Sequence, residues 1–236
     1  MDPIVTARTE RARRLPVLAW RFGEPRLCIA SGPLGGGIGA RDWVLNATVP
    51  LDYDRRDPDR HLREIGAALG LPGDGTGLLT AVDVTRHHLS ADDGVHAAAT
   101  VGLSSPAWAA APDGHFRREL PSGTATTVFA DYRAVDYPVG TINIVVAVPM
   151  RLSDAALVNA VATATEAKVQ ALHQAGVAAT GTASDAVVVH CPTPGAAEPY
   201  GGPRSMFGAR IARAVHTAVL AGSRCWIATH RGAPLR

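Results

Sequence analysis

Two aliphatic runs, separated by a long alanine-rich segment, form the most regular pattern in the chain. Residues 142–149 and 186–190 are almost entirely apolar, which is typical of strands buried on both faces of a sheet. Between them, residues 155–175 are rich in Ala and Leu and contain no Gly or Pro, and either Ser153 or Asp154 can serve as the N-cap. The pattern predicts a strand-helix-strand unit.

Shorter apolar runs, divided by Gly and Pro turns, predict the remaining elements. We expect one hairpin from strands 15–22 and 26–31, and a second antiparallel hairpin from strands 78–84 and 95–103. A further strand is expected at 43–50, and helices at 57–71 and 204–220. The predicted fold class is therefore α/β, a single-domain sandwich in which helices cover a mixed or mainly antiparallel sheet.

The long alanine-rich helix carries one lysine within its apolar stripe. At about 100° per residue, Lys168 lies on the same stripe as Leu157 and Leu172. A buried ammonium must be paired, so Lys168 suggests a functional partner, although a long side chain can also extend to solvent. Glu166 and Thr163 lie on a second, polar face, where simple exposure to solvent explains Glu166 equally well.

Length and charge narrow the class of protein. The 236 residues are expected to form one domain, residues 15–236, preceded by a basic, flexible N-terminal segment, residues 1–14. A net charge of only +2 gives no electrostatic reason to expect nucleic acid as a partner. No apolar run is long enough to span a membrane, and residues 1–14 hold no secretory signal.

Three separated cysteines form no Cys-x-x-Cys pair, which is typical of a reducing compartment. We therefore expect a cytoplasmic protein, and leave oligomer formation open.

The segment from Gly32 to Ala40 contains five glycines. Gly35, Gly37 and Ala40 fit the dinucleotide-binding pattern, but a strand follows where that site requires a helix. The interpretations that remain are a turn close to a ligand and a purely structural turn.

A metal site is the less favoured interpretation of the polar segment 85–96. His87, His88 and His96 with two aspartates are suitable metal ligands, but residues 90–94 also read as an ordinary turn between strands. No metal is predicted.

Three polar motifs occur in the central part of the chain. They are Gly140-Thr-Ile-Asn-Ile, Thr165-Glu-Ala-Lys, and Thr180-Gly-Thr-Ala-Ser-Asp-Ala-Val-Val-Val. In the order and approximate spacing of these motifs, the chain resembles the adenosylcobinamide amidohydrolases. Ser184 stands where a second Thr is expected and keeps the hydroxyl. The resemblance covers about residues 27–222, with a gap near 104–136, where the family's Asn and Arg-Gly loop is replaced.

The resemblance implies an activity and a set of site residues. The family hydrolyses the amide joining the aminopropanol arm to the corrin ring of adenosylcobinamide, giving adenosylcobyric acid for coenzyme B12 salvage. The corrinoid and its cobalt are the substrate, so no separate cofactor is expected. The implied catalytic residues are Lys168, Glu166, Thr182, Asp185 and Asn143. The implied substrate-binding residues are Ser31, Gly35, Gly36, Gly37, Asn46, Asp83, Thr141, Gly181, Ser184, Tyr200 and Gly201.

Amide hydrolysis requires an activated nucleophile, donors for the developing oxyanion and an acid for the leaving amine. Lys168 can act as a base or as an oxyanion clamp, and we expect its partner to be Asp185 or a substrate oxygen. A Ser-His-Asp triad is not supported, because the chain has no Gly-x-Ser-x-Gly elbow. Without the resemblance, Thr182 and Asp185 read as a structural turn before a strand.

Two other classes of function stay open. One is a non-catalytic corrinoid-binding module that uses the glycine-rich loops as a cradle. The other is an amide hydrolase or acyltransferase that acts on a different substrate.

Overall fold

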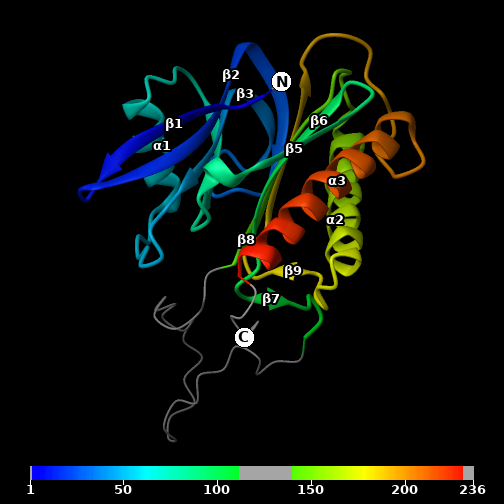
Figure 1. Ribbon diagram of the computed structural model, residues 1–236. Coiled ribbons are helices and arrows are strands. Elements are labelled where there is room, and N and C mark those ends of the chain that lie inside the picture. The colour runs from blue at the N-terminus through cyan, green and yellow to red at the C-terminus, as the bar shows by residue number, and fades with distance from the viewer. Residues whose placement is uncertain (1, 112–139, 231–236) are drawn as a thin grey trace, which may run out of the picture.

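The computed structural model describes residues 2–111 and 140–230, and its centre is an eight-stranded mixed sheet (Figure 1). The strand order is β4-β3-β2-β10-β8-β6-β5, and β1 pairs with β2. The β3–β4 and β8–β10 pairs are parallel and the other pairs are antiparallel, so the predicted mixed α/β fold is confirmed. The strands are β1 (Ile4–Glu10), β2 (Arg13–Ala30), β3 (Gly37–Thr48), β4 (Gly75–Thr80), β5 (His88–Asp92), β6 (Val95–Gly102), β8 (Thr141–Ala147) and β10 (Ala186–Pro192).

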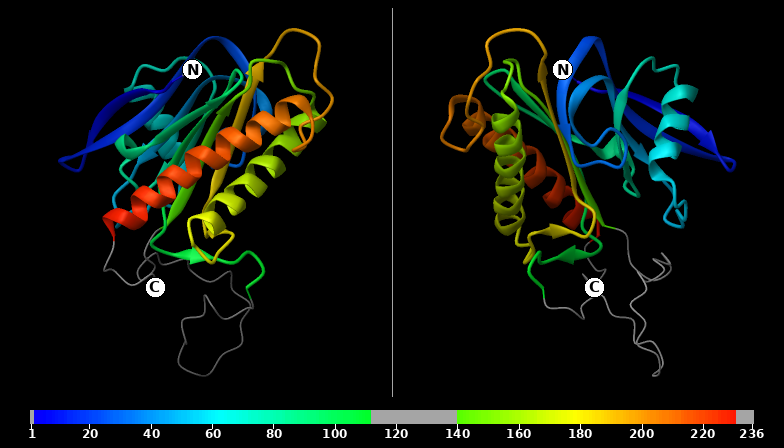
Figure 2. Two further views of the ribbon diagram at one scale, coloured as in Figure 1. Left: turned by 45° about the vertical axis from the view of Figure 1, so that its right-hand side comes forward. Right: turned by 180° about the vertical axis from the view of Figure 1, so that it is seen from behind.

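The helices lie on both sides of the sheet. Figure 2 shows α2 (Asp154–Gln174) and α3 (Met206–Thr229) side by side on one side, and α1 (Pro58–Ala68) on the other. Serines 153 and 205 cap α2 and α3, since each hydroxyl accepts a hydrogen bond from a backbone N–H of the first turn. A small second sheet pairs β7 (Pro106–Ala107) with β9 (Gly181–Thr182).

The predicted strand-helix-strand unit is confirmed as β8-α2-β10. Its two strands are parallel neighbours, with Ala186 opposite Asn143. Alternate residues of β8 face opposite layers, as the two-residue period of a strand requires. Ile142 and Ile144 pack with α2 and α3, whereas Val145 packs with residues of β2, β3 and β10.

The predicted hairpin within residues 15–31 is wrong, because β2 is one strand of 18 residues. Both halves of β2 pair with β3, and the register shifts between Arg21 and Arg26. The Gly-Glu-Pro sequence thus forms an irregularity within the strand, where a missing proline N–H is tolerated. Leu18 and Trp20 from the first half of β2 pack in the same cluster as Val188 of β10.

The predicted pairing of strands 78–84 and 95–103 is also wrong. β6 pairs with β5 and β8, and β4 pairs in parallel with β3. The turn expected at residues 90–94 is shorter than predicted, because residues 88–92 form β5. Only Asp93 and Gly94 connect β5 to β6, with φ values of 42° and 86°. Positive φ at both central residues is the hairpin turn that matches strand twist.

The N-terminal segment is ordered, which corrects the prediction of a flexible leader. Residues 4–10 form β1, and Arg11 and Ala12 make the turn into β2. The Arg8 guanidinium donates to Glu10 Oε2 at 3.0 Å, and His61 Nε2 lies 3.1 Å from the same oxygen. The sequence pattern alone does not reveal that Glu10 lies between Arg8 and His61.

Within the described residues, no helix is both long enough and apolar enough to cross a membrane.

His190 is fully buried on β10, beside the Phe22 ring. Arg26 Nε donates to His190 Nδ1 at 2.8 Å, and burial together with this cation lowers the pKa of His190 to about 3. In the unfolded chain a histidine takes up a proton near pH 6.5, whereas in the folded protein His190 does so only near pH 3. Acidification between these two values therefore favours the unfolded state. Stability should therefore fall between pH 6.5 and pH 3.

We expect His190 to account for about 2 kcal/mol of the stability lost between pH 7 and pH 5. In His190→Asn the amide oxygen can still accept from Arg26, but the titrating group is gone. Urea unfolding at both pH values should show a pH-dependent loss smaller by that amount in the variant than in the wild type. Equal losses in both proteins would refute this role of His190.

Candidate active site

A buried ion pair joins Lys168 of α2 to Asp185, the residue before β10. Lys168 Nζ donates to Asp185 Oδ2, and the two side chains are only 8% and 10% exposed. Of the two partners expected for Lys168, Asp185 or a substrate oxygen, the structure shows Asp185. Lys168 is also the only lysine in the chain, whereas the other 22 basic residues counted with it are arginines.

The Asp185 carboxylate receives hydrogen bonds from four donors. Besides Lys168, these are Thr182 N at 3.1 Å, Thr182 Oγ1 at 2.5 Å and Ile142 N at 3.0 Å. The Ile142 bond ties the turn before β10 to the first residues of β8. Asp185 thus fixes the turn, as the structural interpretation expected, and also orients the Thr182 hydroxyl and the Lys168 ammonium.

Gly181 makes room for the ion pair. A Cβ at this position would overlap Asp185 Oδ2 and lie 2.6 Å from Lys168 Nζ. The backbone of the neighbouring Thr182 is held by the pairing of β9 with β7, in which Thr182 lies opposite Pro106.

We expect Gly181→Ala to displace the Lys168–Asp185 pair. The cost should be about 1–3 kcal/mol of stability, the usual range for overpacking, together with a fall in activity. Thermal unfolding and turnover measured on the same preparation test this. Gly23→Ala is the matched control, since a Cβ there meets nothing within 4 Å. A Gly181→Ala protein as stable and active as the control would contradict the close packing.

Hydroxyl groups extend from the ion pair toward the surface. Thr141 Oγ1 is buried and lies 2.8 Å from Ser184 Oγ, which is exposed and also donates to Gly140 O at 3.3 Å. Thr182 is half-buried. The structure therefore brings Thr141, Gly181, Thr182 and Ser184 together around Lys168 and Asp185.

Asn143 belongs to a separate polar network on the other face of β8. Its Nδ2 donates to Asn46 Oδ1 at 2.9 Å and to Leu79 O at 3.0 Å, and Asn46 Nδ2 donates to Thr100 Oγ1 at 3.0 Å. These bonds join β3, β4, β6 and β8. The structure does not bring Asn143 or Asn46 to the side chains of the ion pair.

Glu166 is exposed on α2, away from the stripe that carries Lys168. Thr163, placed with it on a polar face, is instead buried and donates to Gly201 O at 2.9 Å. Gly201 packs against the N-terminal half of α2, where a Cβ would overlap Ala156 O. Tyr200 is 72% exposed beside a hollow of about 370 Å³. Glu166, Tyr200 and Gly201 are thus not part of the ion-pair cluster.

The glycine-rich turn packs mainly against the protein itself. Gly35 has φ +62°, and a Cβ on it would overlap Gly75 O, so this residue has a structural reason to be glycine. Gly36 faces the backbone of Gly32, whereas a Cβ on Gly37 meets nothing within 4 Å. Ser31 lies closer to the cluster, since its Oγ accepts from Val187 N of β10 at 2.9 Å. Contact of this turn with substrate stays a prediction.

The acidic residues of segment 85–96 are engaged by arginines of α3. Asp92 pairs with Arg213, and Asp93 pairs with Arg210. His87 Nδ1 lies 3.0 Å from Val84 O. In residues 2–111 and 140–230, no three His, Cys, Asp or Glu side chains are grouped as a metal site.

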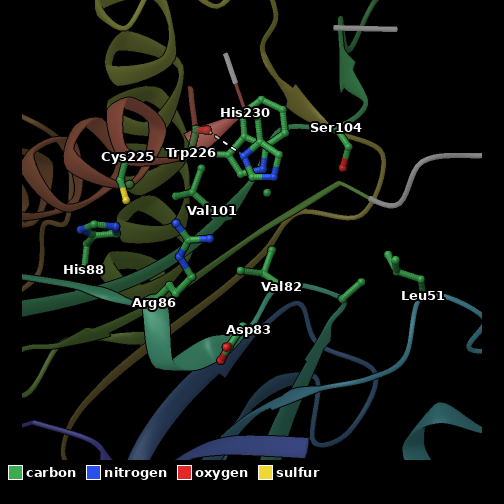
Figure 3. Close-up of a pocket in the computed structure, with 13 residues that line it drawn as sticks. Leu51, Val82, Asp83, Arg86, His88, Val101, Ser104, Cys225, Trp226 and His230 are labelled. Atoms are coloured by element: carbon green, nitrogen blue, oxygen red, sulfur yellow. Dashed lines mark hydrogen bonds between the residues drawn. The ribbon is translucent and has the colours of Figure 1, made fainter. Parts of the chain in front are cut away.

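A cavity of about 210 Å³ opens at the carboxyl ends of β4 and β6, against the last turns of α3 (Figure 3). Of the predicted residues, Asp83 lines it. From the sequence, His88 was considered only as a metal ligand, and no role was predicted for Arg86, Trp226 and His230. The last two lie beyond residue 220, where the helix was expected to end, and their four-residue spacing on a longer helix was the available signal.

The comparisons with known proteins agree on one family. A family model described as adenosylcobinamide amidohydrolase matches residues 2–231. A protein named adenosylcobinamide amidohydrolase from Methanosarcina mazei is 31% identical over 198 residues, covering 80% of this chain and 86% of the relative. One of the same name from Halobacterium salinarum is 36% identical over 188 residues, covering 79% of this chain and 75% of the relative. The resemblance carried by the three motifs is confirmed, and the chain belongs to the adenosylcobinamide amidohydrolase family.

Proposed function

We propose that this protein hydrolyses adenosylcobinamide at the amide of the aminopropanol arm, giving adenosylcobyric acid for cobamide salvage. Family membership supports an amidohydrolase acting on this substrate. The observation that carries the proposal to particular residues is the buried Lys168–Asp185 pair with the Thr182 hydroxyl held against it. Two of the three family-like motifs supply these side chains, and the third supplies Thr141 and the Ile142 amide.

Lys168 is assigned the role of an oxyanion clamp. Within the described residues, Asp185 is the one acceptor bonded to Nζ, so two of the three N–H donors of the ammonium remain for a substrate. A cation that is already fixed and largely shielded from water stabilises a developing negative charge strongly. The ion pair with Asp185 favours this role over that of a neutral lysine base.

Thr182 is assigned the role of nucleophile. Of the three hydroxyls, only that of Thr182 donates to the carboxylate, whereas Thr141 and Ser184 are bonded to each other. The hydroxyl oxygen attacks the amide carbonyl, its proton passes to Asp185, and the same proton then reaches the leaving amine as the C–N bond breaks. Water hydrolyses the resulting ester, which restores the threonine and yields the carboxylic acid.

Within the described residues, no histidine is hydrogen-bonded to Thr182, Ser184 or Asp185. His190 is the histidine nearest in sequence. Its side chain lies on the side of the sheet that carries Phe22, and it accepts a hydrogen bond from Arg26. The site is therefore proposed as a Thr–Asp–Lys arrangement and not as a histidine-dependent triad.

Purified protein incubated with adenosylcobinamide tests the activity. We expect aminopropanol and adenosylcobyric acid to appear in equal amounts with no added metal or cofactor. A corrinoid-binding module would bind the substrate without releasing aminopropanol, and an enzyme for another substrate would do neither. The cytoplasmic location stays a prediction.

A further inference from the structure

The 210 Å³ cavity lies one strand away from the proposed active site. It is lined by Gly102, the last residue of β6, whose partner in β8 is Thr141. Gly140 lies between the cavity residue Gly102 and the active-site residue Thr182. A Cβ added to Gly140 would lie 2.9 Å from Gly102 O and 3.3 Å from Thr182 Cγ2. When the amide of a substrate is held at Thr182, other groups of the same substrate therefore lie close to the cavity.

We propose that this cavity receives the adenosyl group of the substrate and so sets the preference for adenosylated corrinoids. This inference rests on the proposed function, which it extends from the reaction to the choice of substrate. Its volume is below the roughly 300 Å³ at which pockets for whole small ligands begin, so it suits one projecting group and not the corrin ring.

The walls suit a flat, uncharged ring. Trp226 lies in the last turn of α3, and His230 is the residue that follows this helix. Their rings stack with centroids 4.3 Å apart and planes 10° apart, which gives the cavity an aromatic edge (Figure 3). Leu51, Val82 and Val101 supply aliphatic surface. Aromatic side chains bind nucleobases by stacking, since every base offers a π face.

A few polar groups are placed for the sugar and the base edges. Asp83 is exposed and already holds the Thr85 backbone N–H and hydroxyl, at 3.0 and 2.7 Å, so its carboxylate is fixed in orientation. A fixed carboxylate of this kind is a suitable acceptor for ribose hydroxyls. Arg86 and His88 lie on the same wall, and burial lowers the pKa of His88, which favours its neutral form at pH 7.

Gly222 explains how α3 comes close enough to form this cavity. A Cβ at residue 222 would lie 2.6 Å from Val101 Cγ2 and 3.1 Å from His88 Cδ2. Glycine within a helix costs about 1 kcal/mol relative to alanine. The glycine therefore allows α3 to pack closely against β6 and to place Trp226 at the cavity.

The test compares adenosylcobinamide with dicyanocobinamide, which lacks the adenosyl group. Trp226→Ala should lower kcat/KM for adenosylcobinamide about tenfold, the scale of one lost base-stacking contact, and change that for dicyanocobinamide less than twofold. Trp226→Phe keeps a stacking ring and should retain most of the preference. Met206→Ala, an exposed position at the other end of α3, is the control and should change neither.

An equal fall for both substrates, or a wild type with no preference for the adenosylated one, would overturn the inference while leaving the proposed function standing. Wild type that cleaves neither would instead refute the proposed function.

Adenosine alone provides a readout that does not depend on catalysis. For about 20 non-hydrogen atoms, a Kd on the order of 0.1–1 mM is expected. Titration to about 10 mM should quench tryptophan fluorescence in the wild type, and the Trp226-dependent part should vanish in Trp226→Phe. No quenching at that concentration, or equal quenching in the two proteins, would count against the adenosyl site.

Discussion

Lys168→Met is expected to lower kcat/KM for adenosylcobinamide by about 100-fold or more while the protein stays folded. That scale is typical of one lost polar stabiliser of an oxyanion. Methionine roughly preserves the length and apolar contacts of the lysine stem, and Asp185 keeps its bonds from Ile142 N and from Thr182. The carboxylate is thus not left without donors, which is the usual cause of collapse when a buried pair is broken.

Circular dichroism, thermal unfolding and steady-state kinetics on the same preparation measure both effects. Gln170→Met is the matched control, because it places the same side chain on the exposed face of the same helix. Its activity should stay within twofold of the wild type. Near-normal turnover by a well-folded Lys168→Met protein would end the assignment of Lys168 as a clamp.

Thr182→Val should reduce turnover more than any other single substitution considered, by about 1000-fold or more. Valine keeps the shape of threonine but has no hydroxyl to attack the carbonyl, and loss of a nucleophile generally leaves only the catalysis due to binding and oxyanion donors. The stability cost should be limited to about 0.5–1.5 kcal/mol, that of one hydrogen bond, since Ile142 N still reaches Asp185 Oδ1.

Two further variants separate the nucleophile from its neighbours. Thr182→Ser retains a hydroxyl at the same position and should keep at least a tenth of the wild-type rate. Ser184→Ala removes a hydroxyl that is bonded to Thr141 and Gly140 but not to Asp185, and should cost less than tenfold. A Thr182→Val protein as active as Ser184→Ala would show that the nucleophile lies elsewhere.

The parts of the site that local sequence encodes were predictable. Helical periodicity placed Lys168 on an apolar stripe, and the cost of an unpaired buried ammonium required a partner, which is Asp185 in the structure. The turn of residues 180–185 lies directly before β10, so its polar residues had to reach the end of the sheet. The unusual use of a single lysine among arginines points to the same residue.

What depends on distant pairing was not predictable from local pattern. The Gly-Glu-Pro sequence looks like a turn unless both flanking segments are known to pair with β3. β5 is polar and only half-buried, so its composition does not predict a strand. It forms a strand because its backbone pairs with β6. Asn143 belongs to the Gly140-Thr-Ile-Asn-Ile motif, but the alternation of side chains along β8 directs it to the face of the sheet opposite α2. Trp226 lines the same cavity as Arg86 and Val82 because α3 packs against β6.

Hydrolysis in heavy-oxygen water tests the central claim most directly. If the protein cleaves the aminopropanol amide by hydrolysis, mass spectrometry will show adenosylcobyric acid with one solvent oxygen in its new carboxyl group, formed in equal amount to free aminopropanol. A corrinoid recovered unchanged, or a product that carries no solvent oxygen, would contradict the account.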